Sequence, residues 1–138
     1  MASLQRYVDI GQSAEAVWDA VRDYGQLHIR IAPGLVTDTV LEEGGAFRTV
    51  TFANGMSLRE ALLGIDDENR RLAWSAASDL WHHHNASLTV TDLGAGKSRT
   101  TWIADVLPDE AGETIAMIME MGLGAMKAHI ESAGSQNL

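Results

Sequence analysis

Residues 46–65 have the sequence AFRTVTFANGMSLREALLGI. Apolar and polar residues alternate before the pair Asn54-Gly55, and a second run rich in apolar residues follows it. An Asn-Gly pair between two such runs favours a tight turn, because both residues tolerate the positive φ angles that the turn requires. The stretch therefore predicts a β-hairpin with strands at 46–52 and 57–65.

Similar strand patterns occur on both sides of this hairpin and are separated by turn residues. The further predicted strands are 4–10, 35–42, 71–77, 82–91 and 99–106. Their regular spacing, with Gly, Pro, Asn and Asp between them, is typical of an antiparallel meander. Together with the hairpin they make a sheet of seven strands.

Helices are predicted after the first strand and at the end of the chain. Ser13 is a good N-cap for a helix that ends at Tyr24-Gly25, and a further short turn is expected at 26–31. Between 109 and 132 apolar residues recur in steps of three and four, which predicts a long amphipathic helix. The order β-α-α-β₆-α indicates an α+β fold, with an antiparallel sheet and helices on one face.

Composition narrows the classes of function. The chain has 138 residues, which fits a single domain at 1–138, and it has no cysteine for disulfides or thiolate metal sites. Nineteen acidic against ten basic residues give a net charge of -9, which disfavours binding to nucleic acid or to anionic lipid surfaces. No signal peptide or apolar run of about 20 residues is visible, so we expect a cytoplasmic protein without membrane insertion.

Several local phrases, spread over nearly the whole chain, carry a family resemblance. They are SAEAVW at 13–18, RTVTF at 48–52 with Asn54-Gly55, LREALLGIDD at 58–67 and SRTTW at 98–102. With the order of elements, they resemble the START-like, Bet v 1-like helix-grip superfamily (SRPBCC), and within it the bacterial polyketide cyclase/dehydrase and lipid-transport group. The resemblance implies a curved sheet wrapped around the long C-terminal helix, with an apolar cavity between them.

The last helix also favours a cavity. Its methionines are flexible and suit a surface that adapts to ligands, and Gly122 and Gly124 remove side-chain volume from the helix. For any single residue the alternative is that the methionine fills the core, or that the glycine permits close packing of helix and sheet. Taken together, the cluster favours a cavity wall that includes Met117, Met119, Met121 and Met126.

Strand periodicity assigns side chains to faces of the sheet. Trp102 shares a face with Ala104 and Val106, and this face is predicted to point inward. In the neighbouring strand His82 and His84 share a face with Leu88 and are expected at the cavity rim, while Trp81 and His83 point away. The candidate ligand-binding residues are Trp102, His28, Arg30, His82, Leu88, Trp74, Met119, Gly122 and Met126.

Acid–base chemistry has two leading candidates, His84 and Glu60. Glu60 shares a strand face with two leucines, where a carboxylate would be desolvated, although pairing with an arginine across the sheet is the simpler alternative. An aldol cyclisation needs a base and a group that stabilises the enolate. His28 or His84 could supply the base, and Arg30 or Arg59 the stabilising charge.

The sequence predicts no functional metal site and no cofactor. His82 and His84 could form a ligand pair on one strand face, but the sequence pattern shows no complete set of metal ligands. The leading hypothesis is binding of a hydrophobic small molecule, aromatic or polyketide-like, by a monomer or homodimer. The alternatives are a cofactor-independent cyclase or dehydratase, and a module that binds a protein partner.

Overall fold

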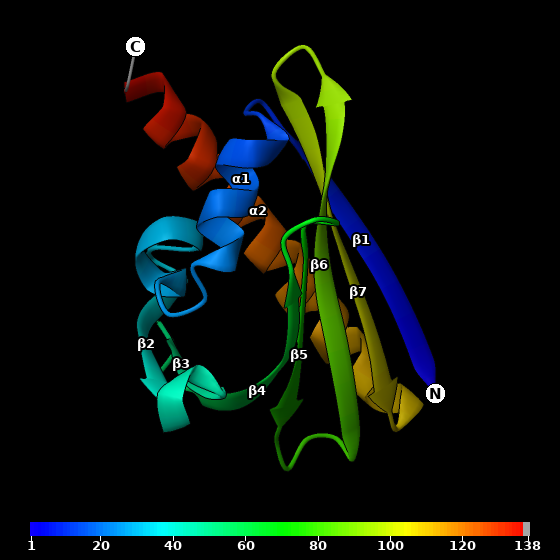
Figure 1. The fold of residues 1–138 in the computed structure, drawn as a ribbon. Coiled ribbons are helices and arrows are strands. Elements are labelled where there is room, and N and C mark those ends of the chain that lie inside the picture. Colours follow the sequence, from blue (N-terminus) through cyan, green and yellow to red (C-terminus); the bar gives the residue numbers. More distant parts are fainter. Residues whose placement is uncertain (137–138) are drawn as a thin grey trace.

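The computed structural model describes residues 1–136 and confirms the predicted order of elements (Figure 1). The strands are β1 (Ala2–Ile10), β2 (Val36–Glu42), β3 (Phe47–Phe52), β4 (Ser57–Asp66), β5 (Arg71–Ala77), β6 (His83–Gly94) and β7 (Lys97–Leu107). The α-helices are α1 (Ala14–Arg22) and α2 (Gly112–Gln136). Three short helical turns are η1 (Leu27–Ile31), η2 (Glu43–Gly45) and η3 (Asp109–Ala111).

The seven strands form one antiparallel sheet in the order β1-β7-β6-β5-β4-β3-β2. All neighbours are consecutive in the chain except β1, which pairs along its whole length with the last strand, β7. Register shifts interrupt the ladders between Val36 and Asp38, between Leu62 and Gly64, and between Asp92 and Gly94. Such bulges bend a strand and increase its twist, and the sheet is curved accordingly.

The helices differ slightly from their predicted bounds. The Ser13 hydroxyl accepts a hydrogen bond from the Ala16 N–H (3.1 Å), which confirms the N-cap, but α1 ends at Arg22, two residues earlier than predicted. The segment predicted as a short turn at 26–31 is η1, a single π-helical turn. The long helix begins at Gly112, because the chain first makes the turn η3 after Pro108.

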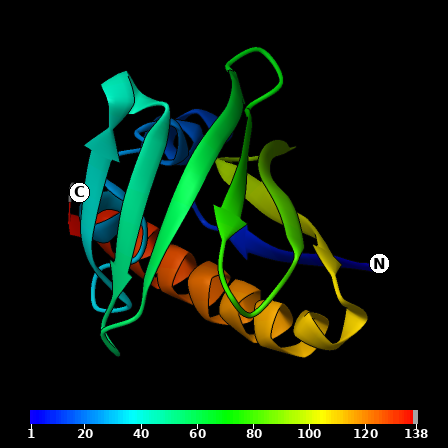
Figure 2. The same cartoon turned by 90° about the horizontal axis from the view of Figure 1, so that it is seen from below.

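Helix α2 lies along the concave side of the sheet (Figure 2). Its buried side chains follow the helical repeat and pack into the core beside the strands; they are Ile115, Met119, Leu123, Met126 and Ile130. The prediction that all four helix methionines belong to the cavity wall is wrong. Met117 and Met121 are 62% and 51% exposed, because their positions in the helical repeat turn them away from the sheet. Among the described residues, no helix has the length and apolar character needed to span a membrane.

The two mid-helix glycines have different surroundings, and this difference can be tested. A Cβ atom at Gly122 would lie 2.8 Å from Cζ3 of Trp102, whereas one at Gly124 would meet no atom within 4 Å. Gly122→Ala is therefore expected to lower the free energy of unfolding by about 1–2 kcal/mol, because the indole must shift. Gly124→Ala should raise it by up to about 1 kcal/mol through helix propensity alone. Urea denaturation measures both, and equal stabilisation by the two substitutions would contradict the tight contact.

Candidate functional site

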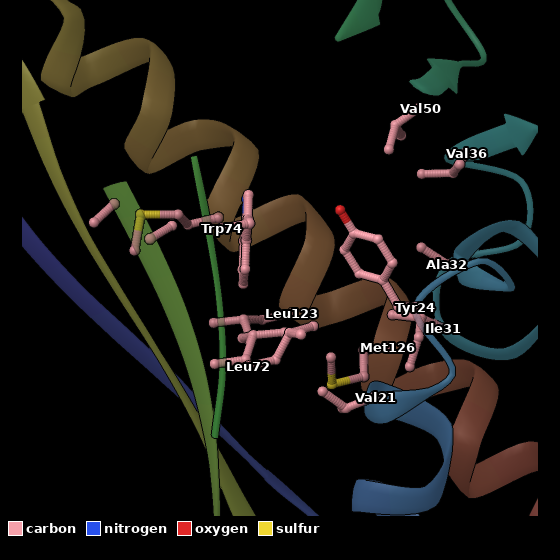
Figure 3. Close-up of a cluster of buried hydrophobic side chains, with 14 of the residues drawn as sticks. Val21, Tyr24, Ile31, Ala32, Val36, Val50, Leu72, Trp74, Leu123 and Met126 are labelled. Carbon is pink, nitrogen blue, oxygen red and sulfur yellow. The ribbon is translucent and has the colours of Figure 1, made fainter. Parts of the chain in front are cut away.

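A cavity of about 80 Å³ lies between the sheet and α2. Its wall is apolar apart from three ionisable side chains, those of Arg48, Glu60 and His84. The sheet contributes Val50, Phe52, Leu58, Trp74, Ala76, Leu88 and Trp102, the segment around η1 contributes Leu27, Ile31, Ala32, Leu35 and Val36, and α2 contributes Ile115, Ile118, Gly122 and Met126. Figure 3 shows Trp74 on the β5 side, with Val36 and Val50 on the opposite side.

The three ionisable side chains lie in one row across four strands. Arg48 on β3 is the register partner of Glu60 on β4, and Glu60 is the register partner of Ala76 on β5. On β6, His84 reaches Ala76 by a hydrogen bond between its Nδ1 and the Ala76 N–H (3.1 Å). Arg48, Glu60, Ala76 and His84 all line the cavity, so the row faces into it.

Arg48 and Glu60 form a buried ion pair. Their side chains are 6% and 9% exposed, and Arg48 Nε donates to Glu60 Oε1 at 2.7 Å. Arg48 Nη1 also donates to the Tyr24 carbonyl oxygen (3.1 Å), and the guanidinium carbon lies 4.4 Å from the centroid of the Tyr24 ring. The Tyr24 hydroxyl in turn donates to the Glu60 carbonyl oxygen (3.3 Å). These contacts compensate both charges, which a buried pair requires.

His84 is a neutral imidazole that accepts a hydrogen bond in this arrangement. Burial lowers its pKa to about 4. Its Nδ1 accepts a hydrogen bond from the Ala76 N–H, so the proton of the neutral ring lies on Nε2. The indole of Trp81 packs beside the imidazole, with ring centroids 5.5 Å apart, and donates to the Ala76 carbonyl oxygen (2.8 Å). The side chains of His84 and Trp81 thus pair with the N–H and the carbonyl oxygen of Ala76, and these bonds hold the imidazole in place.

Two tryptophans form one corner of the cavity. The rings of Trp74 and Trp102 have centroids 5.6 Å apart and are tilted by 59°. Trp102 also lies against Gly122 of α2, where no side chain competes for the space. Its Nε1–H is buried and has no hydrogen-bond partner among the described residues.

Most of the candidate residues from the sequence lie in this wall. The cavity is lined by Trp74, Leu88, Trp102, Gly122, Met126, Glu60 and His84. Met119 is fully buried in the core but is not part of the lining. Glu60 is paired with an arginine across the sheet, as the simpler alternative expected, but the pair faces inward.

Three other candidates lie outside the lining. His82 is exposed and precedes β6. Arg30 is in η1 but binds Asp19 (2.6 Å) and Asp23 (3.0 Å) on the outside of the protein. His28, in the same turn, is half-buried, and its Nδ1 has no partner among the described residues.

Arg59, the other arginine considered for enolate stabilisation, lies on the outer face of β4. It binds Glu42 at 2.9 Å and stacks on the ring of Phe47. Both contacts keep its charge away from the cavity, where Arg48 is found instead.

Sequence reasoning missed Arg48 and misplaced Trp81. Arg48 shares one face of β3 with Val50 and Phe52, so its inward direction could have been assigned from the strand pattern. The prediction that Trp81 points away is wrong, because β6 begins at His83 and its alternation does not extend back to residue 81. Among the residues that the structure describes, no group of three or more possible ligands is placed to hold a metal ion.

A family model described as polyketide cyclase/dehydrase and lipid transport matches residues 1–131. The chain belongs to this family. No curated protein matches the sequence.

Solved structures share the helix-grip fold. An uncharacterised protein from Bacillus thuringiensis has a TM-score of 0.84 at 20% identity, with 94% of this chain and 98% of that chain covered. The di-domain ARO/CYC BexL of the BE-7585A biosynthetic pathway has a TM-score of 0.80 at 14% identity, covering 95% of this chain and 47% of that one. Norcoclaurine synthase from Thalictrum flavum, in complex with dopamine and hydroxybenzaldehyde, has a TM-score of 0.72 at 17% identity, covering 99% and 88%. At these identities the likeness concerns the fold.

Breaking the buried ion pair is expected to be more damaging than removing it. Arg48→Met leaves Glu60 uncompensated and should lower the free energy of unfolding by about 3–5 kcal/mol. The double variant Arg48→Met/Glu60→Leu should recover most of this loss, because no buried charge remains. Arg59→Met removes an exposed arginine and should cost about 1 kcal/mol or less. Chemical denaturation at pH 7 compares the three, and a double variant as unstable as Arg48→Met would contradict the account.

His84 should make stability depend on pH. Its pKa is about 4 in the folded protein, against 6.5 for an ordinary histidine, so the unfolded chain takes up a proton first as the pH falls. The free energy of unfolding should therefore decrease by about 2 kcal/mol between pH 7 and pH 5 through this group. His84→Gln should remove that part of the decrease. Denaturation series for both proteins measure it, and parallel pH profiles would show that His84 is not the cause.

Proposed function

We propose that the protein binds a small hydrophobic molecule in the cavity between the sheet and α2. The observation that carries the proposal is the cavity wall, which is almost entirely apolar and brings a few polar groups together in one row. Binding sites for small molecules typically combine an apolar wall with a small number of placed polar groups.

The size of the cavity favours ligands with one ring. Its volume of about 80 Å³ is less than the roughly 150 Å³ of an engineered cavity that accepts benzene, so the wall must move when a ring enters. Met126 is a flexible part of the wall, and η1 contributes Leu27 and Ile31 from a single helical turn. We infer that the ligand enters by displacing η1, the shortest element of the lining.

The comparisons support an aromatic ligand. The family description includes both lipid transport and polyketide cyclisation. Norcoclaurine synthase, which shares the fold, is described in complex with two aromatic compounds, dopamine and hydroxybenzaldehyde. The tilted pair Trp74 and Trp102 gives this chain an aromatic surface on which such a ring can pack.

Adjacent positions on α2 provide a matched test of binding. Ile118 lines the cavity, whereas Met117 is exposed to solvent. Ile118→Trp should fill the cavity and weaken binding of cumene or acetophenone at least about 10-fold, because the indole takes the space of the ring. Met117→Trp adds the same side chain outside and should leave binding unchanged. Calorimetric titration or ligand-observed NMR measures the affinities of both variants. A wild-type protein that binds neither cumene nor acetophenone would refute the proposal.

Acid–base catalysis is the second candidate function, and the row of polar groups favours it. Glu60 could remove a proton next to a carbonyl group, while Arg48 and His84 donate hydrogen bonds to the enolate oxygen. His84 acts as a donor here and not as a base, since its proton lies on Nε2. This chemistry agrees with a cofactor-independent cyclase or dehydratase.

Exchange of the methyl protons of acetophenone for deuterium measures enolisation directly by NMR. If Glu60 is the base, Glu60→Gln should slow exchange in the acetophenone-saturated protein by about 10²–10⁴-fold. The rate is compared at saturation because the substitution leaves the Arg48 charge uncompensated and can change the affinity. Arg59→Met, on the outer face, is the control. Binding without any exchange above the rate in buffer would leave a carrier as the description of the protein.

A further inference from the structure

We propose that the cavity selects neutral ligands that carry a hydrogen-bond-accepting oxygen beside the ring. This inference rests on the proposed binding function and specifies the chemical class of the ligand. It is carried by the hydrogen-bonding state of the groups in the row and by the balance of charge among them.

The cavity offers more donors than acceptors. Within residues 1–136, Arg48 donates from Nε and Nη1, which leaves its Nη2 to a ligand or to water. His84 has its proton on Nε2, and no described residue accepts it. The buried Nε1–H of Trp102 is also without a partner in this part of the chain. Leaving such donors unpaired is unfavourable, so an acceptor on the ligand would be preferred over a methyl group.

The position of the row leaves room for that acceptor. Ala76 lies between Glu60 and His84 in the row and contributes only a methyl group to the wall. Larger side chains stand on either side of it. An oxygen placed over Ala76 would lie next to the His84 imidazole on one side and to the Arg48–Glu60 pair on the other, while the ring packs against the tryptophans.

Charge balance disfavours ionised ligands. The positive charge of Arg48 and the negative charge of Glu60 compensate each other, and His84 is neutral. A carboxylate would therefore add an uncompensated negative charge to an apolar cavity, and an amidinium an uncompensated positive one. The net charge of -9 of the whole chain further opposes the approach of anions.

Four compounds of nearly the same shape test the selectivity. Cumene is apolar, acetophenone is neutral with an acceptor oxygen, benzoate is an anion and benzamidinium is a cation. At pH 7 acetophenone is expected to bind about 10-fold more tightly than cumene, since its oxygen accepts from a charged or a buried donor. Benzoate and benzamidinium should bind at least about 10-fold more weakly than acetophenone. Displacement measured by ligand-observed NMR gives all four affinities on one scale.

Two variants test whether the row of polar groups causes the preference for acetophenone over cumene. Arg48→Met/Glu60→Leu removes the ion pair as a unit and should reduce the preference for acetophenone over cumene to about 3-fold or less, while cumene still binds. Arg59→Met should keep the wild-type preference. Equal affinities for cumene and acetophenone, or tighter binding of an ion, would overturn the inference and leave the cavity as a binding site. Absence of binding by both cumene and acetophenone would instead overturn the proposed function itself.

Discussion

One helix covers the concave side of a seven-stranded sheet, and a single helix is too narrow to fill that surface. Its buried face packs closely where strand β1 and the last strand lie, and Gly122 allows it to approach Trp102. Val50 of β3 and Leu58 of β4 instead line the cavity, together with Ile118 and Met126 of α2. The cavity forms because α2 is narrower than the concave face of the sheet, and η1 provides part of the cavity wall.

A buried ion pair in such a cavity needs an explanation, because apolar residues of the same volume would serve stability equally well or better. Arg48 and Glu60 are compensated by each other, by Tyr24 and by the backbone, so the protein tolerates them. They also give the wall a local electric field and directed donors, which an apolar wall cannot provide. Their position therefore supports the proposed binding of a small molecule in the cavity.

His84 illustrates how neighbouring backbone groups define the chemistry of a side chain. The ladder partners of β5 and β6 extend from Arg71 and Thr89 to Trp74 and Ala86, and Ala76 lies just beyond this ladder. The imidazole takes the N–H of Ala76 and the indole of Trp81 takes its carbonyl group. This arrangement fixes the tautomer, and burial keeps the ring neutral. The Nδ1 of a histidine that sequence patterns present as a possible base is thereby occupied by the Ala76 N–H.

The sequence by itself determined the order of strands and helices, the turn at Asn54-Gly55, the N-cap at Ser13 and the inward face of Trp102. These features depend on residues close together in the chain, whose periodicity and turn preferences act locally. Only the tertiary structure decided that Arg48 meets Glu60 and that Trp81 turns inward. Those outcomes depend on strand register and on the residue at which a strand begins. Contacts between distant parts of the chain set both, and no local pattern encodes them.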